Sequence, residues 1–329
     1  SIGSEIVRQV AGYSISRLIL LDQAESPLFH LELEVVEKFG GKDIGIIVAD
    51  ICDAERMAQI FEEYRPQLVY HAAAYKHVPM MEANPSEAVR TNVEGTMILA
   101  NLAVKYKVEK FIMISTDKAV KPTSVMGASK RIAEMYTQAM NRRNGTRFIT
   151  TRFGNVLGSN GSVIPLFREQ ISKGGPVTVT HPEITRYFMT IPEACQLVLE
   201  AGAMGKGGEI YIFDMGQSIK IVDLARKMIM LSGLTLGSDI QIKFTGLRPG
   251  EKLYEELLND EENTLPTHHP QIMIAKEREF DLETVSAQVN ELIAFPDSFD
   301  GFSIVKKMKE IVPEFKSQNS VYERLDRAE

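Results

Sequence analysis

Cysteine is scarce in this sequence, with only Cys52 and Cys195 among 329 residues. The two lie far apart and in no spacing typical of metal ligands, so we expect no metal site and two buried thiols, as in proteins of a reducing, cytoplasmic compartment. Long apolar stretches are lacking too: no run of about 18 or more apolar residues occurs, which excludes a membrane-spanning helix among these residues. Positive charge is not in excess, because the formal net charge is −7, and this disfavours a nucleic-acid surface.

An initiating methionine is also lacking. The first ten residues, SIGSEIVRQV, form an amphipathic helical pattern with Ile2, Ile6, Val7 and Val10 on one side. Because nothing precedes this helix, the sequence starts inside a structural unit. We therefore expect it to be part of a longer chain.

Short apolar runs that alternate with helical patterns dominate the first half. Runs rich in Ile, Leu and Val predict buried parallel strands at residues 17–22, 44–50, 67–74, 110–116 and 146–155. Helical patterns lie between them at residues 27–39, 54–64, 85–106 and 125–143. Repeated strand–helix units predict an α/β fold with a doubly wound parallel sheet of the Rossmann type.

Beyond residue 155 the pattern loosens, and glycine and proline become frequent. Two more helices are predicted near residues 192–204 and 221–232, and one or two in the tail after residue 281. We expect a first domain over residues 1–155, onto which residues 186–215 pack back. A smaller, discontinuous region over residues 156–329 would then bind the substrate.

A dinucleotide-binding fold starts with a strand and a Gly-rich turn, and the sequence contains neither. Gly3 fits the last glycine of such a turn, or else a glycine that merely starts a helix. Asp22 ends the next strand, where an acid binds the adenosine ribose and favours NAD, although a plain turn residue is the alternative. The other cofactor candidates follow the next two strands: Asp50 and Ile51, near the adenine, and Ala72 and Ala73, small residues that let a cofactor lie against the backbone.

Four long motifs carry a resemblance to a known family: HAAAYKHVPMMEANPSEAVRTNVEGT, STDKAVKPTSVMGASKR, TRFGNVLGSNGSVIPLF and GLRPGEKLYEEL. They resemble the extended short-chain dehydrogenase/reductases, and more closely the nucleotide-sugar 4,6-dehydratases that act on UDP-N-acetylglucosamine in capsule and glycan synthesis. The resemblance covers essentially the whole chain. It implies NAD as the cofactor, a UDP-sugar as the substrate and a homo-oligomer. Many relatives are membrane proteins with a C-terminal catalytic part, so it also implies the cytosolic domain of an inner-membrane protein whose membrane segment lies outside these residues.

The turn STDK follows a strand at the sheet edge where open α/β proteins bind ligands. In the resembled family, the residue at the position of Asp117, after Thr116, is the acid toward the sugar C6 hydroxyl, and the residue at the position of Lys118 removes the C5 proton. Lysine is a poor base at its reference pKa of about 10.4, so we expect desolvation or the nearby Lys130 to favour its neutral form. The alternative is a surface salt bridge between Asp117 and Lys118.

Met126 stands four residues before Lys130, where the broad family keeps a catalytic tyrosine. The resemblance implies that Lys130 binds the nicotinamide ribose. Met126 cannot take the proton of the C4 hydroxyl, because a thioether has no titratable proton, and simple core packing is its alternative role. One branch of the dehydratases also carries methionine here. We therefore expect another group, in the first place Asp117, to take that proton.

The substrate candidates lie on loops. Asn155 resembles the family asparagine that touches the sugar diphosphate, and Glu251, in RPGEK, resembles the residue that holds the uridine ribose. Arg186 and Arg248 are candidates for the diphosphate, since guanidinium binds phosphate in a bidentate manner. Lys76 and His77 are expected to line the sugar pocket, and for all six residues a solvated charge or a loop hydrogen bond is the alternative.

The sequence is compatible with two other functions. A UDP-sugar 4-epimerase shares the fold and the first hydride step, but epimerases usually keep the tyrosine and lack an acid–base pair after the strand-end threonine. A catalytically inactive module that binds NAD or a nucleotide sugar is the non-enzyme alternative, supported by Met126. A chain that truly starts at Ser1 is expected to bind NAD weakly or not at all.

Overall fold

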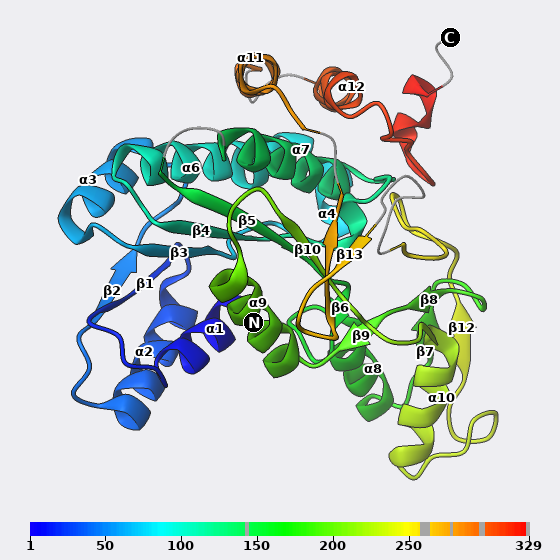
Figure 1. Cartoon of the computed structure of the whole chain (residues 1–329). Helices are drawn as coiled ribbons and strands as arrows, with labels where there is room; N and C mark the ends of the chain where they lie inside the picture. Colours follow the sequence, from blue (N-terminus) through cyan, green and yellow to red (C-terminus); the bar gives the residue numbers. More distant parts are fainter. Residues whose placement is uncertain (142–144, 257–263, 277–278, 296–299, 327–329) are drawn as a thin grey trace.

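The computed structural model describes residues 1–141, 145–256, 264–276, 279–295 and 300–326. Figure 1 shows a twisted central sheet with helices on both faces and a smaller lobe beside one end of it. This confirms the predicted α/β class with a mainly parallel sheet. Among the described helices, none is long and apolar enough to span a membrane.

The main sheet has six strands in the order β13-β14-β10-β5-β4-β3. Four of them are parallel neighbours: β3 (Leu68–His71), β4 (Lys110–Ile114), β5 (Arg147–Arg152) and β10 (Ile210–Phe213). β14 (Ile272–Ala275) and β13 (Thr264–Pro266) add an antiparallel edge. β4 and β10 are almost wholly buried, as strands covered on both faces must be.

The first two strands form a separate sheet. β1 (Leu18–Asp22) and β2 (Ile44–Val48) pair in parallel, and within the described residues neither is hydrogen-bonded to β3. The central sheet is therefore divided between β1 and β3. A doubly wound sheet has one more strand at this place. The sequence pattern indicated that these residues do not supply it.

Helices cover both faces of the main sheet (Figure 1). One face carries α3 (Ala54–Tyr64), α6 (Gly95–Lys105) and α7 (Val125–Met140), and the other carries α1 (Ile2–Val10) and α9 (Ile191–Met204), whereas α2 (Glu25–Phe39) packs on the β1–β2 sheet. The single helix predicted over residues 85–106 is in fact α5 (Pro85–Ala88), a π-helical turn at Val89–Glu94 and α6. The short α4 (Val78–Ala83) precedes α5 and was not predicted.

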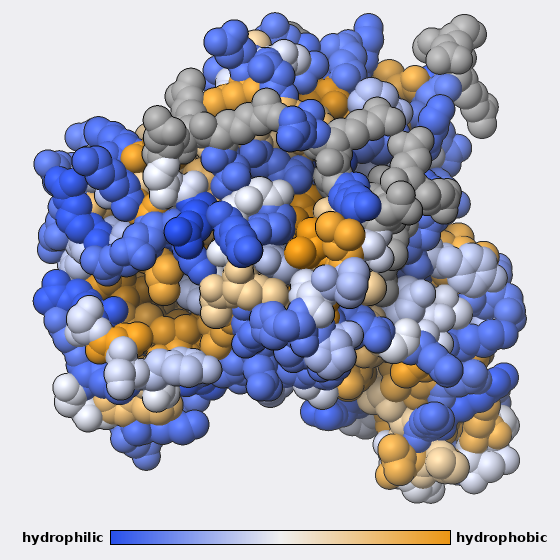
Figure 2. Space-filling view, viewed as in Figure 1, coloured by the Kyte–Doolittle hydropathy of each residue, from blue (hydrophilic) through white to orange (hydrophobic). Residues whose placement is uncertain are grey.

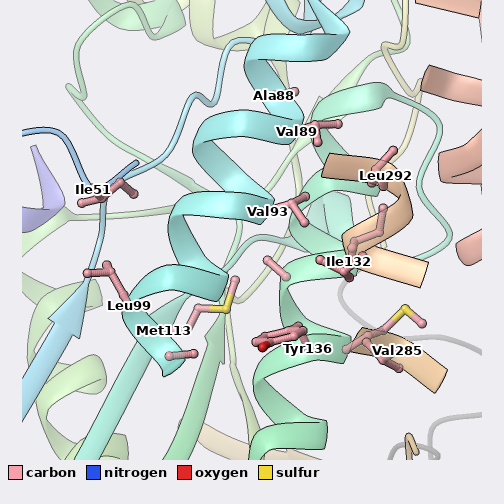
Figure 3. Close-up of a cluster of buried hydrophobic side chains, with 14 of the residues drawn as sticks. Ile51, Ala88, Val89, Val93, Leu99, Met113, Ile132, Tyr136, Val285 and Leu292 are labelled. Atoms are coloured by element: carbon pink, nitrogen blue, oxygen red, sulfur yellow. The ribbon is translucent and has the colours of Figure 1, made fainter. Parts of the chain in front are cut away.

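Helix α7 lies in the centre of the largest core cluster and is buried on nearly its whole surface. Figure 3 shows Ile132 and Tyr136 of α7 between Met113 of β4 and Val285 of the tail helix α11 (Leu282–Ile293). A second tail helix, α12 (Gly301–Ile311), and a short 3-10 helix at Val321–Leu325 follow. The tail therefore packs on the first lobe, next to α7.

The second lobe has its own apolar core. It consists of α8 (Val163–Ser172), β7 (Val177–Val179) paired with β12 (Ile242–Phe244), β8 (Thr185–Arg186) paired with β11 (Ile219–Lys220), and α10 (Ile221–Leu231). The short pair β6 (Asn155–Val156) and β9 (Phe188–Met189) connects the lobes. Between the end of β9 and residue 213 the chain returns to the first lobe as α9 and β10.

Candidate active site

A cleft of about 1350 Å³ includes the gap between β1 and β3, passes the carboxyl ends of β3 and β4 and reaches the second lobe. Figure 2 shows hydrophobic residues gathered in a hollow near the β1–β2 sheet, and residues of β1 and β3 line this part of the cleft. The cleft brings together most of the residues predicted from the sequence: Gly3, Asp22, Ile51, Ala72, Ala73, Lys76, His77, Thr116, Lys118, Met126, Lys130, Asn155, Arg186, Arg248 and Glu251.

The small residues predicted for the cofactor lie close together. An added Cβ atom on Gly3, in the first turn of α1, would stand 3.8 Å from the Cβ atom of Ala72, so only small side chains separate this helix start from the end of β3. Asp22 lines the cleft, and its Oδ1 atom accepts a hydrogen bond from the backbone of Ala24 at 2.9 Å. A backbone approach of this kind, beside an acid at a strand end, fits a dinucleotide.

Asp50 is the one cofactor candidate that does not line the cleft. Its Oδ1 atom accepts a hydrogen bond from the backbone of Cys52 at 2.9 Å, and its Oδ2 atom lies 3.6 Å from the guanidinium of Arg90. The neighbouring Ile51 reaches the cleft instead. The sequence could not reveal this, because the choice between neighbours depends on where α6 and its preceding turn sit.

The turn after β4 positions the predicted acid and base. Thr116 caps a single 3-10 turn, Asp117–Ala119, and donates a hydrogen bond to Asp117 Oδ1 at 2.9 Å. The side chain of Asp117 is fully buried, and its Oδ2 atom has no hydrogen-bond partner among the described residues. An added Cβ atom on Gly154 would stand 3.0 Å from that oxygen, so the lack of a side chain there makes room for the carboxylate.

Lys118 points its ammonium group at three oxygen atoms. Its Nζ atom lies 2.9 Å from Asp117 Oδ1, 3.3 Å from Asn155 Oδ1 and 3.5 Å from Glu255 Oε1. Desolvation lowers the pKa of Lys118, but attraction to Asp117 and Glu255 outweighs it, so the pKa is raised above its ordinary value. Our expectation that the surroundings favour the neutral amine was therefore wrong. The predicted alternative, a salt bridge with Asp117, is present, but it links a cleft-lining lysine to a buried carboxylate and does not lie on the surface.

Glu255 was missed in the sequence. It stands four residues after Glu251 in the same RPGEKLYEE motif, which is the signal that pointed to this loop. Its side chain is only 2% exposed, and its Oε1 atom also lies 3.6 Å from Arg186 Nε. The Oε2 atom is buried and has no partner among the described residues.

Met126 and Lys130 lie one turn apart on α7 and both line the cleft, as their spacing predicts. Both are nearly buried, at 3% and 4% exposure. Desolvation lowers the pKa of Lys130 to about 8, although the carboxylate of Glu134 opposes this shift. Near neutral pH this lysine is therefore close to its titration point.

A buried ion-pair network lies under the STDK turn. Glu134 Oε1 accepts hydrogen bonds from Ser115 Oγ at 2.6 Å and from Arg152 Nε at 2.8 Å. Its Oε2 atom accepts from Arg152 Nη2 at 2.6 Å and from Arg131 Nη1 at 3.2 Å. Burial raises the pKa of Glu134, but Arg152 and Arg131 more than reverse that effect, so the group stays ionised. The network fixes the end of β4 against α7 and β5.

Two loops meet at the predicted sugar pocket. Lys76 Nζ lies 3.5 Å from Ser159 Oγ, and the ring of His77 stands against Gly161, where an added Cβ atom would collide with it. Burial lowers the pKa of Lys76 and of His77. The YKH segment after β3 is thus in contact with the GSNGS loop from the other side of the cleft.

The residues predicted for the nucleotide are tied to one another. Glu251 lies 3.5 Å from Arg186 Nη2 and 3.3 Å from Arg248 Nη2, and it accepts a hydrogen bond from the backbone of Arg248 at 3.0 Å. Arg186 is buried and also donates to the carbonyl groups of Thr185 and Lys252. Arg248 keeps a side chain that is 58% exposed at the cleft. Of the two arginines, Arg248 is therefore the one with an accessible guanidinium.

The tail connects the two ends of the cleft. The backbone of Gln318 donates to Thr123 O at 3.2 Å and accepts from Gly250 N at 2.7 Å, so it bridges the α7 entry and the RPGEK loop. Glu82 on α4 supports the same region: its carboxylate accepts from Val125 N at 2.7 Å and from Ser320 Oγ at 2.5 Å.

Comparison with known proteins gives several matches. A family profile described as polysaccharide biosynthesis protein matches residues 1–277. The chain is 54% identical over 278 residues to the capsular polysaccharide biosynthesis protein CapD of Staphylococcus aureus, covering 84% of this chain and 45% of that protein. It is 48% identical to EpsC of Bacillus subtilis, a probable polysaccharide biosynthesis protein. The chain spans about half the length of each of these two curated relatives.

Two other relatives carry names of specific reactions. The chain is 33% identical over 257 residues to a UDP-N-acetylglucosamine 4,6-dehydratase (inverting) of Campylobacter jejuni, covering 77% of this chain and 72% of that protein. It is 42% identical over 197 residues to a UDP-glucose 4-epimerase of Rickettsia canadensis, covering 59% of this chain and 56% of that protein.

Among solved structures, Pen from Bacillus thuringiensis matches with a TM-score of 0.76 and 34% identity, over 85% of this chain and 87% of that chain. A dTDP-glucose 4,6-dehydratase (DesIV) from Streptomyces venezuelae, solved with NAD and DAU bound, matches with a TM-score of 0.65 and 24% identity, over 74% and 81%. The second likeness concerns the fold alone.

Proposed function

This chain belongs to the polysaccharide biosynthesis protein family of extended short-chain dehydrogenase/reductases, and from that premise we propose that it catalyses the 4,6-dehydration of a UDP-N-acetylhexosamine. UDP-N-acetylglucosamine is the first choice of substrate, and the product is a 4-keto-6-deoxy sugar for surface polysaccharide. The relative from Campylobacter jejuni supports this reaction by its name and by its coverage of this chain.

The contact between Asp117 and Lys118 carries the proposal. A carboxylate and an ammonium group lie 2.9 Å apart at the end of a parallel strand, beside a cleft that extends from the strand ends to the second lobe. Elimination of water across C5 and C6 needs one group that takes a proton from carbon and one that gives a proton to the departing oxygen. The pair supplies both groups within one turn of chain.

We assign the proton transfers to these two residues. Asp117 takes the proton of the C4 hydroxyl, a step for which Met126 has no suitable group. Lys118 then removes the C5 proton, which the C4 ketone has made acidic, while Asp117 returns its proton to the C6 oxygen and water leaves. Lys118 finally gives a proton back to C5. Both groups end as they began.

NAD is the cofactor in this proposal, and the residues at its end of the cleft fit it. Gly3 and Ala72 leave room for a close approach, Asp22 suits the adenosine ribose, and Lys130 suits the nicotinamide ribose. When bound, NAD would accept the hydride from C4 and return it to C6. The burial that lowers the pKa of Lys130 to about 8 leaves this residue able to change protonation near neutral pH.

A UDP-sugar 4-epimerase is the second candidate, supported by the match to the Rickettsia canadensis protein. An epimerase needs the C4 hydride transfer but neither the C5 proton abstraction nor the loss of water. The Asp117–Lys118 pair would then have no role at C5 and C6, and for this reason we rank dehydration first.

The mass of the product separates the candidates. The protein is incubated with NAD⁺ and UDP-N-acetylglucosamine, and the sugar nucleotide is analysed by mass spectrometry and NMR. Loss of one water supports dehydration, whereas an unchanged mass with inverted C4 indicates an epimerase. Binding of both compounds without turnover would identify an inactive module and end the enzyme proposal.

A further inference from the structure

The ammonium group of Lys118 donates hydrogen bonds to Asp117 and Asn155 and forms an ion pair with Glu255. Asp117, Asn155 and Glu255 present one oxygen each, at 2.9, 3.3 and 3.5 Å from Nζ. An ammonium group has three N–H donors and no lone pair. In this arrangement Lys118 cannot remove a proton from C5, so it must first give one of its own protons to a neighbour.

Two buried carboxylates next to Lys118 have an oxygen atom without a partner among the described residues, Asp117 Oδ2 and Glu255 Oε2. In the proposed reaction, Asp117 is occupied by the proton that it takes from O4 and delivers to the C6 oxygen. Glu255 has no such duty. Its side chain is 2% exposed, so an ionised carboxylate there carries a desolvation cost that protonation would relieve.

We propose that Glu255 is a positioning residue that accepts a proton from Lys118 and thereby generates the neutral amine that acts at C5. This inference rests on the proposed dehydration. In the transfer, one N–H bond of Lys118 breaks and one O–H bond forms on Glu255, and the ion pair becomes a neutral pair. The amine then takes the C5 proton and later returns it to C5, and Glu255 gives its proton back when the site resets. The sequence takes up no net proton from solvent and releases none, and any of the three equivalent N–H protons of Lys118 can be the one returned to C5.

The geometry allows the transfer with a small movement. The Nζ and Oε1 atoms must close from 3.5 Å to a hydrogen-bond distance of about 2.8 Å. Arg186, 3.6 Å away, holds the same carboxylate from β8. The groups that set the charge around the pair come from four segments: Asp117 in the STDK turn, Lys76 after β3, Arg186 on β8, and Lys252 on the RPGEK loop.

The proposal predicts how pH acts on the reaction. In the native protein the proton moves within the cluster, so deprotonation of Lys118 should add no pH dependence to the dehydration rate beyond that which Lys130 imposes on the native protein and the variants alike. In Glu255→Gln the proton of Lys118 has to leave to solvent. The rate should then fall near pH 7 and rise by about tenfold per pH unit on the alkaline side, until the amine is neutral.

The experiment measures kcat for loss of water between pH 6 and pH 10 in three variants. Glu255→Gln should acquire the alkaline rise, and Glu255→Asp, which keeps a carboxylate, should stay closer to the native profile. Glu256→Gln is the matched control, because it neutralises the adjacent acid, which is 47% exposed and pairs with Lys121 at the surface. The control should keep the native profile.

Each other outcome overturns a defined part of the argument. A uniform loss in Glu255→Gln at every pH would assign Glu255 a structural role only, and an unchanged profile would remove it from the reaction. Either result leaves dehydration intact. Absence of water loss in the native protein would instead refute the proposed function, and this inference with it. If Glu255→Gln melts at a much lower temperature, the comparison of Glu255→Asp with the control decides.

Discussion

At the scale of single residues, the STDK turn shows how burial and charge act in opposite directions. Lys118 is drawn toward the neutral form by desolvation, and Asp117 and Glu255 reverse that tendency. Lys130, on the neighbouring helix, has Glu134 as the carboxylate that opposes its desolvation, and its pKa falls to about 8. Two lysines that line the same cleft therefore hold their protons very differently.

Asp117→Asn tests the proposed base for the C4 hydroxyl. Asparagine keeps the shape but cannot take a proton, so single-turnover oxidation at C4 should slow by about 100-fold or more. Reduced cofactor absorbance reports this step directly. Asp223→Asn, on the surface of α10, is the control and should not alter it. Unimpaired hydride transfer in Asp117→Asn would remove Asp117 from this role.

Lys118→Met tests the group that acts at C5. Methionine fills similar space without a titratable proton, so deuterium from solvent should no longer enter C5 of the sugar. NMR of the sugar nucleotide in deuterium oxide measures this exchange. Lys121→Met removes a nearby lysine that pairs with Glu256 at the surface and should leave exchange unchanged. Normal exchange in Lys118→Met would contradict the assignment.

The sequence allowed most lining residues to be predicted because their motifs mark strand ends and loops. Fifteen of the seventeen predicted residues line the cleft, and the other two are Asp50 and the buried Asp117. The sequence could not show which charged side chains pair with one another in the folded protein. Glu255 meets Lys118 across more than 130 residues of chain, and only the folded loop reveals that contact and its effect on the pKa.

At the scale of elements, helix α7 connects core and site. Its hydrophobic side chains meet β4 and α11 (Figure 3), while Met126 and Lys130 line the cleft. Periodicity predicted this helix well, because apolar positions recur on it. Periodicity did not predict the π-helical turn before α6, where the ladder of hydrogen bonds changes without any break in the apolar pattern.

Gly127→Ala tests the contact between α7 and the STDK turn. An added Cβ atom would overlap the carbonyl oxygen of Lys118, so the turn or the helix must move. We expect a loss of about 1–3 kcal/mol in unfolding free energy and a larger fall in kcat than in substrate affinity. Gly202→Ala is the comparison, because its nearest neighbours are side chains, at 3.2 Å or more, which can adjust. Denaturant unfolding and steady-state kinetics measure both effects.

At the scale of the whole molecule, the tail connects the two lobes around the cleft. Gln318 bridges Thr123 of the first lobe and Gly250 of the RPGEK loop, and Glu82 binds both Ser320 and the start of α7. The sequence predicted the tail helices but not their site of packing. Their apolar positions fit any hydrophobic surface, and only tertiary contacts place them against α7.

Replacements of Glu82 test this connection. Glu82→Ala leaves Val125 N without its acceptor, so we expect a loss of about 1–3 kcal/mol in unfolding free energy and faster tryptic cleavage after Lys316. Glu82→Gln can keep both hydrogen bonds. Desolvation raises the pKa of Glu82, so its ionisation costs stability as pH rises from the unfolded pKa through the folded one. The unfolding free energy of Glu82→Gln should therefore increase relative to that of the native protein as pH increases. Equal unfolding free energies and equal cleavage rates in Glu82→Ala and Glu82→Gln would refute the bridging role.

The division of the sheet between β1 and β3 gives the cofactor end of the cleft walls from two different sheets. Asp22 ends β1 and Ala72 follows β3, and both line the cleft, so a ligand that contacts the two residues together spans both sheets. Side chains already join the sheets, because Ile47 of β2 belongs to the core cluster around α7. Such a ligand would add a polar link to an apolar one, and slower amide hydrogen exchange in β1 and β2 would report it.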